Sequence, residues 1–201
     1  GTTIIGNNEN EKAIFLSFHG LLVVNDFVLS NQAEVTFLAS VIVINGNSFQ
    51  NVTKLNFIAD NRNNFDISTG QINAIYPLNG LIFNSGDIKS NVFLELSANQ
   101  IYIQNAIEAI SLNATAESLN FALSGLVNIS SFVQLNVKQV SVNGNMAADD
   151  FSVTSESFIN KGTITVNNDL FLNSVKSFAN LGTIRAKNLL FTEAPCSFDT
   201  S

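Results

Sequence analysis

Hydrophobic and polar residues alternate along most of this chain, in short runs that are interrupted by turn residues. Residues 163–166 read Thr-Ile-Thr-Val, and residues 183–186 read Thr-Ile-Arg-Ala. Successive side chains of a β-strand point to opposite sides, so this pattern predicts strands with one buried and one solvated face. The expected buried set is Ile164, Val166, Ile184 and Ala186. The pattern predicts an all-β chain.

The alternating runs recur at a fixed spacing toward the end of the sequence. Ser-Phe pairs stand at positions 157–158, 177–178 and 197–198, with the same offset each time. Such a period indicates stacked repeats, none of which can bury its apolar face alone. Leucine-rich repeats have a similar period, but neither clear copy contains their Leu-x-x-Leu-x-Leu pattern.

A coil of this length holds two or three short strands that pair in parallel with the next coil, about 4.8 Å away. The sequence therefore predicts a right-handed parallel β-helix (a solenoid) with roughly 20-residue coils, the hand following the rule for parallel crossovers. We expect one β-helical unit over residues 1–201, less regular over 1–80 and with clear repeats over 81–201. A helix over 104–116 is an open alternative, but apolar pairs recurring every nine residues there favour strands.

Two columns of repeated residues define the expected interior and corner. Phe158, Phe178 and Phe198 are expected to lie above one another as an internal aromatic stack. Gly162 and Gly182 each follow an asparagine by two residues. Asparagine and glycine both tolerate positive φ, so a corner is expected before the next strand. Residues 83–88 match 158–164 when one residue is dropped.

The composition agrees with a β-structure and excludes some partners. Charged residues make up only 12% of the chain, about half of the usual share, so short polar side chains supply the surface polarity. A helical surface would normally carry more Lys and Glu. The net charge is −7 and no basic cluster is present, which makes nucleic acid a poor candidate partner.

Few residues could perform catalysis or bind a metal. His19 is the only histidine and Cys196 the only cysteine, so a histidine metal cluster and an internal disulfide are excluded. His19 is expected in a turn. Asp149 and Asp150 are adjacent, and neighbouring side chains of a strand face opposite ways, which weakens them as a general acid/base pair. We predict no catalytic residues, no metal site and no cofactor.

A polar stretch after the expected strand at residues 55–58 is the candidate binding loop. Residues 60–66 read Asp-Asn-Arg-Asn-Asn-Phe-Asp and are expected to protrude from the stack. The candidate binding residues are Asp60, Arg62, Asn63, Asn64 and Asp66.

The clear copies resemble a known repeat. Phe-x-Asn-x-Gly-Thr-Ile at 158–164 and 178–184, with Val-Asn-Asn-Asp-Leu-Phe-Leu at 166–172, is similar to the degenerate repeat of the filamentous-haemagglutinin family of bacterial surface proteins. The resemblance implies a secreted or surface-attached β-helical stalk. It also implies an outer-membrane export partner of the two-partner type and a receptor on a host or neighbouring cell. The Asn-Pro-Asn motifs of the family's secretion domain are absent around Pro77 and Pro195, so a shaft segment or a divergent relative fits better.

These observations lead to a functional expectation. The chain is expected to be a non-enzymatic structural and adhesive segment of a secreted or surface-exposed bacterial protein, acting as a stalk in cell adhesion or toxin delivery. The alternative is a polysaccharide-active β-helical enzyme of the pectate-lyase type, with carboxylates on one outer sheet.

Overall fold

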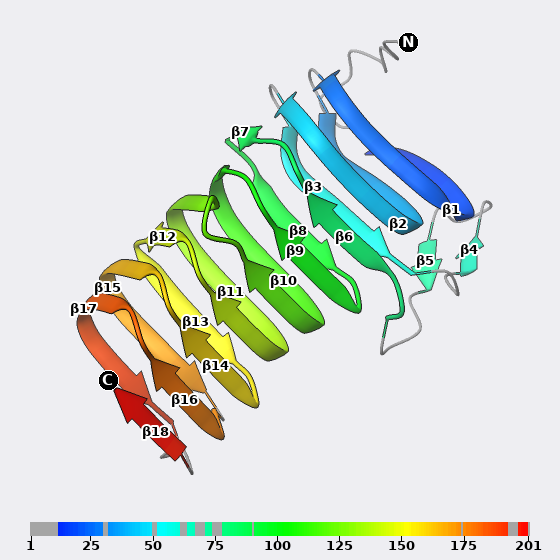
Figure 1. Cartoon of the computed structure of the whole chain (residues 1–201). Coiled ribbons are helices and arrows are strands. Elements are labelled where there is room, and N and C mark those ends of the chain that lie inside the picture. The colour runs from blue at the N-terminus through cyan, green and yellow to red at the C-terminus, as the bar shows by residue number, and fades with distance from the viewer. Residues whose placement is uncertain are drawn as a thin grey trace.

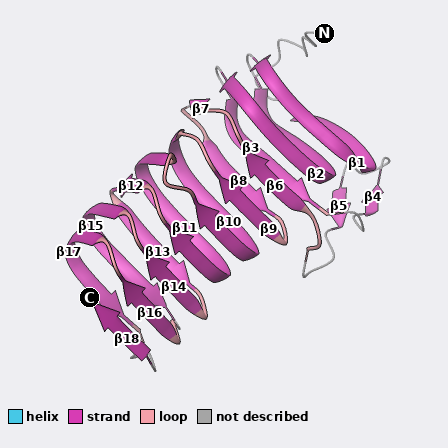
Figure 2. Ribbon diagram, viewed as in Figure 1, coloured by secondary structure: helices cyan, strands magenta, loops and turns pink. Residues whose placement is uncertain are grey.

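The computed structural model describes residues 12–29, 32–49, 52–60, 64–66, 71–73, 78–89, 91–173, 175–192 and 197–200. All regular secondary structure in these residues is β (Figure 2). The strands are, in chain order, β1 (Lys12–Leu29), β2 (Gln32–Phe49), β3 (Val52–Ala59), β4 (Asn64–Asp66), β5 (Gln71–Asn73), β6 (Leu81–Asn84), β7 (Ile88–Lys89), β8 (Phe93–Ser97), β9 (Gln100–Ile103), β10 (Ile107–Phe121), β11 (Leu126–Val142), β12 (Asn145–Ala148), β13 (Asp150–Thr154), β14 (Ser157–Asn160), β15 (Thr163–Asn173), β16 (Ser177–Asn180), β17 (Thr183–Phe191) and β18 (Ser197–Thr200).

Every strand except β4 and β5 belongs to one parallel sheet that winds into a solenoid with roughly 20-residue spacing. The predicted fold class is confirmed, and β10 shows that the stretch 107–121 is strand rather than helix. Figure 1 shows the coils stacked from β1 at one end to β18 at the other.

The strand register divides each coil into three sides, joined by corners. Side A contains residues 12–17, 34–39, 54–59, 93–97, 111–115, 132–136, 150–154, 169–173 and 188–191. Side B contains residues 21–24, 41–44, 81–84, 100–103, 118–121, 139–142, 157–160, 177–180 and 197–200. Side C contains residues 27–29, 47–49, 88–89, 107–109, 126–129, 145–148, 163–166 and 183–186.

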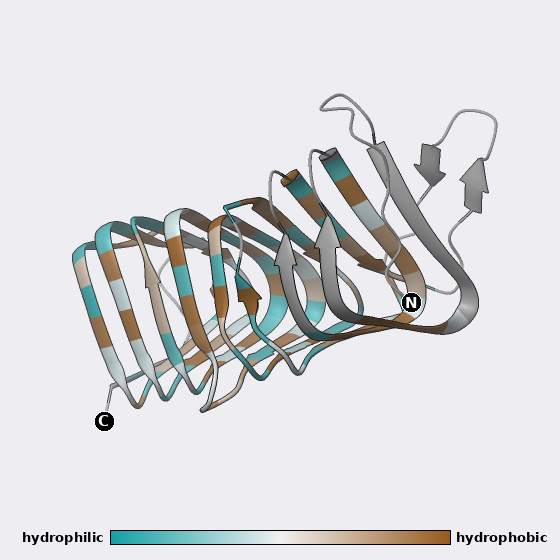
Figure 3. Cartoon of the chain, turned by 90° about the horizontal axis from the view of Figure 1, so that it is seen from above, coloured by the Kyte–Doolittle hydropathy of each residue, from teal (hydrophilic) through white to brown (hydrophobic). Residues whose placement is uncertain are grey.

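The interior is one hydrophobic cluster that extends from Val24 to Phe178. Ile164 and Val166 are buried and Ile184 and Ala186 pack against the same cluster, as the alternation predicted. Figure 3 shows hydrophilic and hydrophobic residues alternating along the coils. Because each coil buries its apolar side chains against the next, the stack is the unit of stability.

Aromatic side chains stack inside the last coils. The rings of Phe158 and Phe178 lie 5.9 Å apart between centroids with an interplanar angle of 4°. Phe178 also meets Phe191 edge to face, at 5.6 Å and 88°. The backbone of Phe198 pairs with Phe178 in the parallel register, and the Phe198 side chain lies outside the described part of the structure.

The repeated glycines are needed for a different reason from the one that the sequence suggested. The φ angles of Gly162 and Gly182 lie outside the left-handed region. Instead, a Cβ on Gly162 would lie 1.9 Å from the carbonyl oxygen of Gly144, and a Cβ on Gly182 would lie 2.1 Å from that of Gly162. Successive backbones approach so closely at this corner that a column of glycines is required.

One coil contains an insertion between its sides A and B. On side A, β3 pairs with β2 at an offset of one repeat, as in Ala39 with Ala59. On side B the offset doubles, because Val41 pairs with Leu81. The chain between Asp60 and Gly80 is therefore additional to the repeat, and within it β4 and β5 form a small antiparallel ribbon beside the main stack (Figure 1).

The register also changes how residues 83–88 align with the clear repeats. A match on the shared phenylalanine would place Phe83 over Phe158. The ladder instead leads from Ile82 through Ile101, Leu119 and Val140 to Phe158. Ile82 is the buried residue, and Phe83 lies on the outer surface of side B.

Candidate functional site

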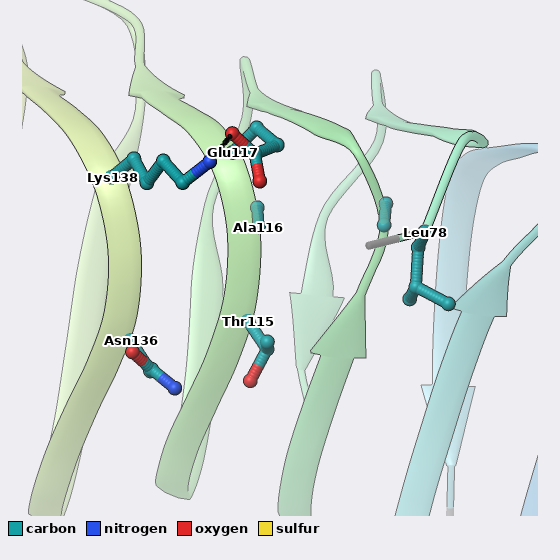
Figure 4. Close-up of a pocket in the computed structure, with 7 residues that line it drawn as sticks. Leu78, Thr115, Ala116, Glu117, Asn136 and Lys138 are labelled. Carbon is teal, nitrogen blue, oxygen red and sulfur yellow. Dashed lines mark ion pairs between the residues drawn. The ribbon is translucent and has the colours of Figure 1, made fainter. Parts of the chain in front are cut away.

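A groove follows the corner between sides A and B. We call it the corner groove. Its first part has a volume of about 390 Å³ and is lined by Leu78, Ala98, Thr115, Ala116, Glu117, Asn136 and Lys138. Figure 4 shows the Lys138 and Glu117 side chains pointing toward each other from neighbouring strands, with Leu78 on the opposite side.

The groove continues toward the C-terminal coils. Its second part, about 260 Å³, shares Asn136 and Lys138 with the first and adds residues 154–156 and Lys176. The groove therefore crosses successive coils instead of following a single one. A ligand lying in it would contact residues that are one coil apart in the sequence.

Small and polar side chains explain why a hollow forms here. Ala98 and Ala116 occupy the corner in adjacent coils, where larger side chains would fill the space. Thr115, Asn136 and Thr154 are aligned by the parallel register. Their hydroxyl and amide groups can donate and accept hydrogen bonds, so the groove presents a polar ladder beside an apolar floor.

Charged side chains of alternating sign line the same corner. Lys138 Nζ lies 2.6 Å from Glu117 Oε2, and Lys176 Nζ lies 3.3 Å from Glu156 Oε1. Backbone hydrogen bonds link Glu156 N to Lys138 O at 3.0 Å and Lys176 N to Glu156 O at 3.1 Å. The four residues therefore form one ladder across successive coils, which we call the charge ladder.

Lys138 is held in its charged form. The hydrogen bond from its ammonium to Glu117 and the charge of Glu117 raise the pKa of Lys138, and the charge of Glu156 adds to this effect; desolvation opposes it. A lysine with a raised pKa is a cation at neutral pH and a poor nucleophile or base. This part of the groove is suited to binding a polar ligand.

The candidate loop is only partly described. Asp60 is 4% exposed, and its backbone N–H donates to the carbonyl of Ala39 at 2.8 Å. The prediction that Asp60 lies on a protruding loop is therefore wrong, because this residue still follows the ladder of side A.

Asn64 and Asp66 lie in β4, opposite Asn73 and Gln71 of β5, and their side chains are outside the described part. Arg62 and Asn63 lie outside the described residues altogether.

The adjacent aspartates have separate partners. Asp149 accepts a hydrogen bond from Asn167 Nδ2 at 2.7 Å, and Asp150 accepts one from the backbone N–H of Asp169 at 3.3 Å. Both contacts join consecutive coils at the corner between sides C and A. The two carboxylates act here as links between coils.

Within the described ranges, no group of three or more His, Cys, Asp or Glu side chains is placed to hold a metal ion. In the same ranges, no helix has the length and apolar character to span a membrane.

Comparison of the chain with protein-family models, curated proteins and solved structures gave no match.

The charge ladder was not predicted from the sequence, although the sequence carries a signal for it. Glu117, Lys138, Glu156 and Lys176 follow one another at intervals that are each close to one coil. Charges of alternating sign at the repeat period, in a chain with few charges, would have pointed to this corner.

Proposed function

We propose that this chain is a structural and adhesive segment of a secreted or surface-exposed bacterial protein, acting as a rigid β-helical stalk in cell adhesion or toxin delivery. The observation that carries the proposal is the uninterrupted parallel stack, in which one hydrophobic core joins coils from Val24 to Phe178. Such a stack transmits a fixed spacing along its axis, which a stalk requires.

Contacts between coils support the role of a stiff spacer. Outside the hydrophobic core, side chains bond from one coil to its neighbour, as Asn188 Nδ2 does to Asp169 Oδ1 at 2.6 Å and Asn173 Nδ2 does to Ser152 Oγ at 2.9 Å. These bonds run along the axis and resist shear between coils. The corner groove adds a surface that could contact a receptor over several coils.

The export route and location follow from the resemblance of residues 158–184 to filamentous-haemagglutinin repeats. We infer an outer-membrane partner of the two-partner type and a receptor on a host or neighbouring cell. A cell-surface location suits a β-stack whose outer positions carry Ser, Thr and Asn, because these short side chains keep the surface soluble at low charge.

The adhesive role is tested with polystyrene beads coated with the purified chain. Coated beads should bind to epithelial or bacterial cells more than beads coated with albumin. A Lys138→Ala, Lys176→Ala double variant should reduce binding if the corner groove contacts the receptor. Lys89→Ala is a matched control, because Lys89 is an exposed, ion-paired lysine on side C. Equal binding of chain-coated and albumin-coated beads to every cell type would overturn the proposal.

A further inference from the structure

The outer surface of side B carries no charge from Leu21 to Ala179. Its outward residues from Leu21 to Ala179 include no Asp, Glu, Lys or Arg, whereas sides A and C carry charged residues such as Glu95 and Arg185. The outward residues of side B are Leu21, Val23, Val41, Val43, Leu81, Phe83, Gln100, Tyr102, Ser118, Asn120, Gln139, Ser141, Ser157, Ile159, Ser177 and Ala179. This surface is apolar in the early coils and becomes rich in Ser, Asn and Gln.

A recess lies where these two parts meet. It has a volume of about 370 Å³ and is lined by Phe83, Tyr102, Ile103, Gln104, Asn120, Ala122, Leu123 and Ser124. This volume is within the range of small-molecule sites, about 300–1,000 Å³. We call it the side B recess.

Two aromatic rings form one wall of the recess. The rings of Phe83 and Tyr102 belong to consecutive coils and lie 6.5 Å apart with an interplanar angle of 53°. Tyr102 is 39% exposed, so part of its ring is open to a ligand. The faces of such rings are electron-rich and attract the polarised C–H groups of a sugar ring.

Amide groups stand beside the rings. Gln104 is exposed, so its side-chain amide is open to solvent and to a ligand. Asn143 Nδ2 donates to Asn120 Oδ1 at 3.0 Å, which orients the Asn120 amide so that its own NH₂ is left to donate outward. Amides that donate and accept at once are suited to hydroxyl groups.

A protruding turn closes the other side of the recess. Leu123 and Ser124 form the corner between β10 and β11, and Leu123 is 82% exposed. The Ser124 hydroxyl donates to the carbonyl of Gln104 at 2.6 Å, so the turn is held against the preceding coil. The recess is therefore preformed by contacts within the protein.

We propose that the side B recess binds a neutral oligosaccharide, with a sugar ring packed on Tyr102 and Phe83 and its hydroxyls bonded to Gln104 and Asn120. An acidic glycan would need a cation, and side B supplies none over residues 21–179. An extended peptide would need a free strand edge, whereas β6 and β9 are hydrogen-bonded to neighbouring strands on both sides. The inference deepens the proposed adhesive role by naming a ligand class.

The test uses an array of neutral and acidic oligosaccharides, including gluco-, manno- and galacto-hexasaccharides and hexagalacturonate. The strongest neutral binder is then titrated by calorimetry. Tyr102→Ala should weaken binding by about tenfold or more, because it removes the stacking ring. Tyr102→Phe should keep most of the affinity. Gln104→Ala should weaken binding without altering the core, since Gln104 is exposed.

Phe93→Ala is the matched control, because Phe93 is a 47% exposed aromatic residue on side A and should leave binding unchanged. Circular dichroism of each variant verifies the fold. The proposal is overturned if no neutral glycan binds, if hexagalacturonate binds best, or if binding survives both Tyr102→Ala and Gln104→Ala. It is also overturned if Tyr102→Ala abolishes self-association in sedimentation while no glycan binds, which would identify side B as a contact between copies.

The bead assay separates this inference from the adhesive role. Suppose that the wild-type chain binds no glycan, but beads coated with the Tyr102→Ala variant still bind cells. This result would overturn glycan binding by the side B recess and leave the adhesive role standing. Glycan binding by the chain, with no binding of its coated beads to cells, would overturn the adhesive role and leave the recess as a glycan site.

Discussion

Asn160 donates a hydrogen bond from Nδ2 to Oδ1 of Asn180 at 2.8 Å, inside the solenoid and between consecutive coils. Asn160 is fully buried, and its own Oδ1 accepts from the backbone N–H of Gly162 at 3.2 Å. Its Nδ2 also lies 3.2 Å from the carbonyl of Thr183. A buried amide whose groups are all used in this way fixes the corner before side C and the alignment of two coils.

Replacing Asn160 by alanine should lower the free energy of unfolding by about 1–3 kcal/mol, because Gly162 N–H and Asn180 would lose a buried partner. Urea unfolding followed by circular dichroism measures this. Asn128→Ala is the control, since Asn128 is exposed on side C and should change stability by less than about 0.5 kcal/mol. Equal effects of the two substitutions would contradict the structural role of the buried amide.

The aromatic stack should be visible in a double-mutant cycle. Phe158→Ala and Phe178→Ala should each cost about 3–5 kcal/mol, because both rings are buried. Their interaction energy should be about 0.5–1.5 kcal/mol, as expected for stacked rings. Phe132→Ala, at a partly exposed ring on side A, should cost far less. Strict additivity of the two core substitutions would show that the rings do not interact.

Replacing different glycines of this corner by alanine should lower the stability of the protein by different amounts. Gly162→Ala would bring Cβ to 1.9 Å from Gly144 O, so the backbone would have to shift, at a cost of about 1–3 kcal/mol or more. Gly125→Ala would meet its nearest atom, Ala122 O, at 3.2 Å and should cost less. Thermal unfolding of both variants gives the comparison. A more stable Gly162→Ala protein would mean that the coils are farther apart at this corner.

Lys138 should contribute a stabilisation that depends on pH. Its folded pKa is raised above 10.5 by the hydrogen bond to Glu117 and by the charge of that residue. The contribution is therefore fully present below about pH 10.5 and is lost as the pH rises through the folded pKa. The difference in melting temperature between the wild type and the Lys138→Met variant should therefore shrink as the pH rises above about 10.5. It should also shrink at high salt concentration, since the pair is partly exposed.

Glu117→Gln provides the control for this pair. In that background, Lys138→Met should change the melting temperature much less than in the wild type, because the partner charge is already absent. An unchanged effect would mean that Lys138 acts through the packing of its aliphatic stem.

The local features of the fold could be predicted from the sequence because they repeat. Alternation with a period of two marks the inner residues of a strand, as at Ile164 and Val166. The recurrence of Phe158 as Phe178 one repeat later indicates that equivalent strands lie above one another. Both signals require only neighbouring residues or one repeat length, so an all-β solenoid followed from them.

The candidate sites could not be predicted as well from the sequence, because they depend on which residues of neighbouring coils lie beside each other. Coil length is not constant in the register, since Ser111 pairs with Phe93 in one direction and with the more distant Phe132 in the other. One coil also carries additional residues between Asp60 and Gly80. A change of one residue moves a side chain from the core to the surface. This is why Phe83, which resembles the inner Phe158, lies outside beside Tyr102.

The sequence by itself determined the alternation, the repeat and the parallel stack, since these are encoded in each coil and in its copy. Only the tertiary structure decided that Asp60 is buried, that Gly162 is required by a close approach to Gly144, and that Glu117 meets Lys138. Each of these depends on the distance between two backbones or side chains that the chain brings together after a full coil. Such distances are set by the corners and bulges of both coils at once, and no single segment contains that information.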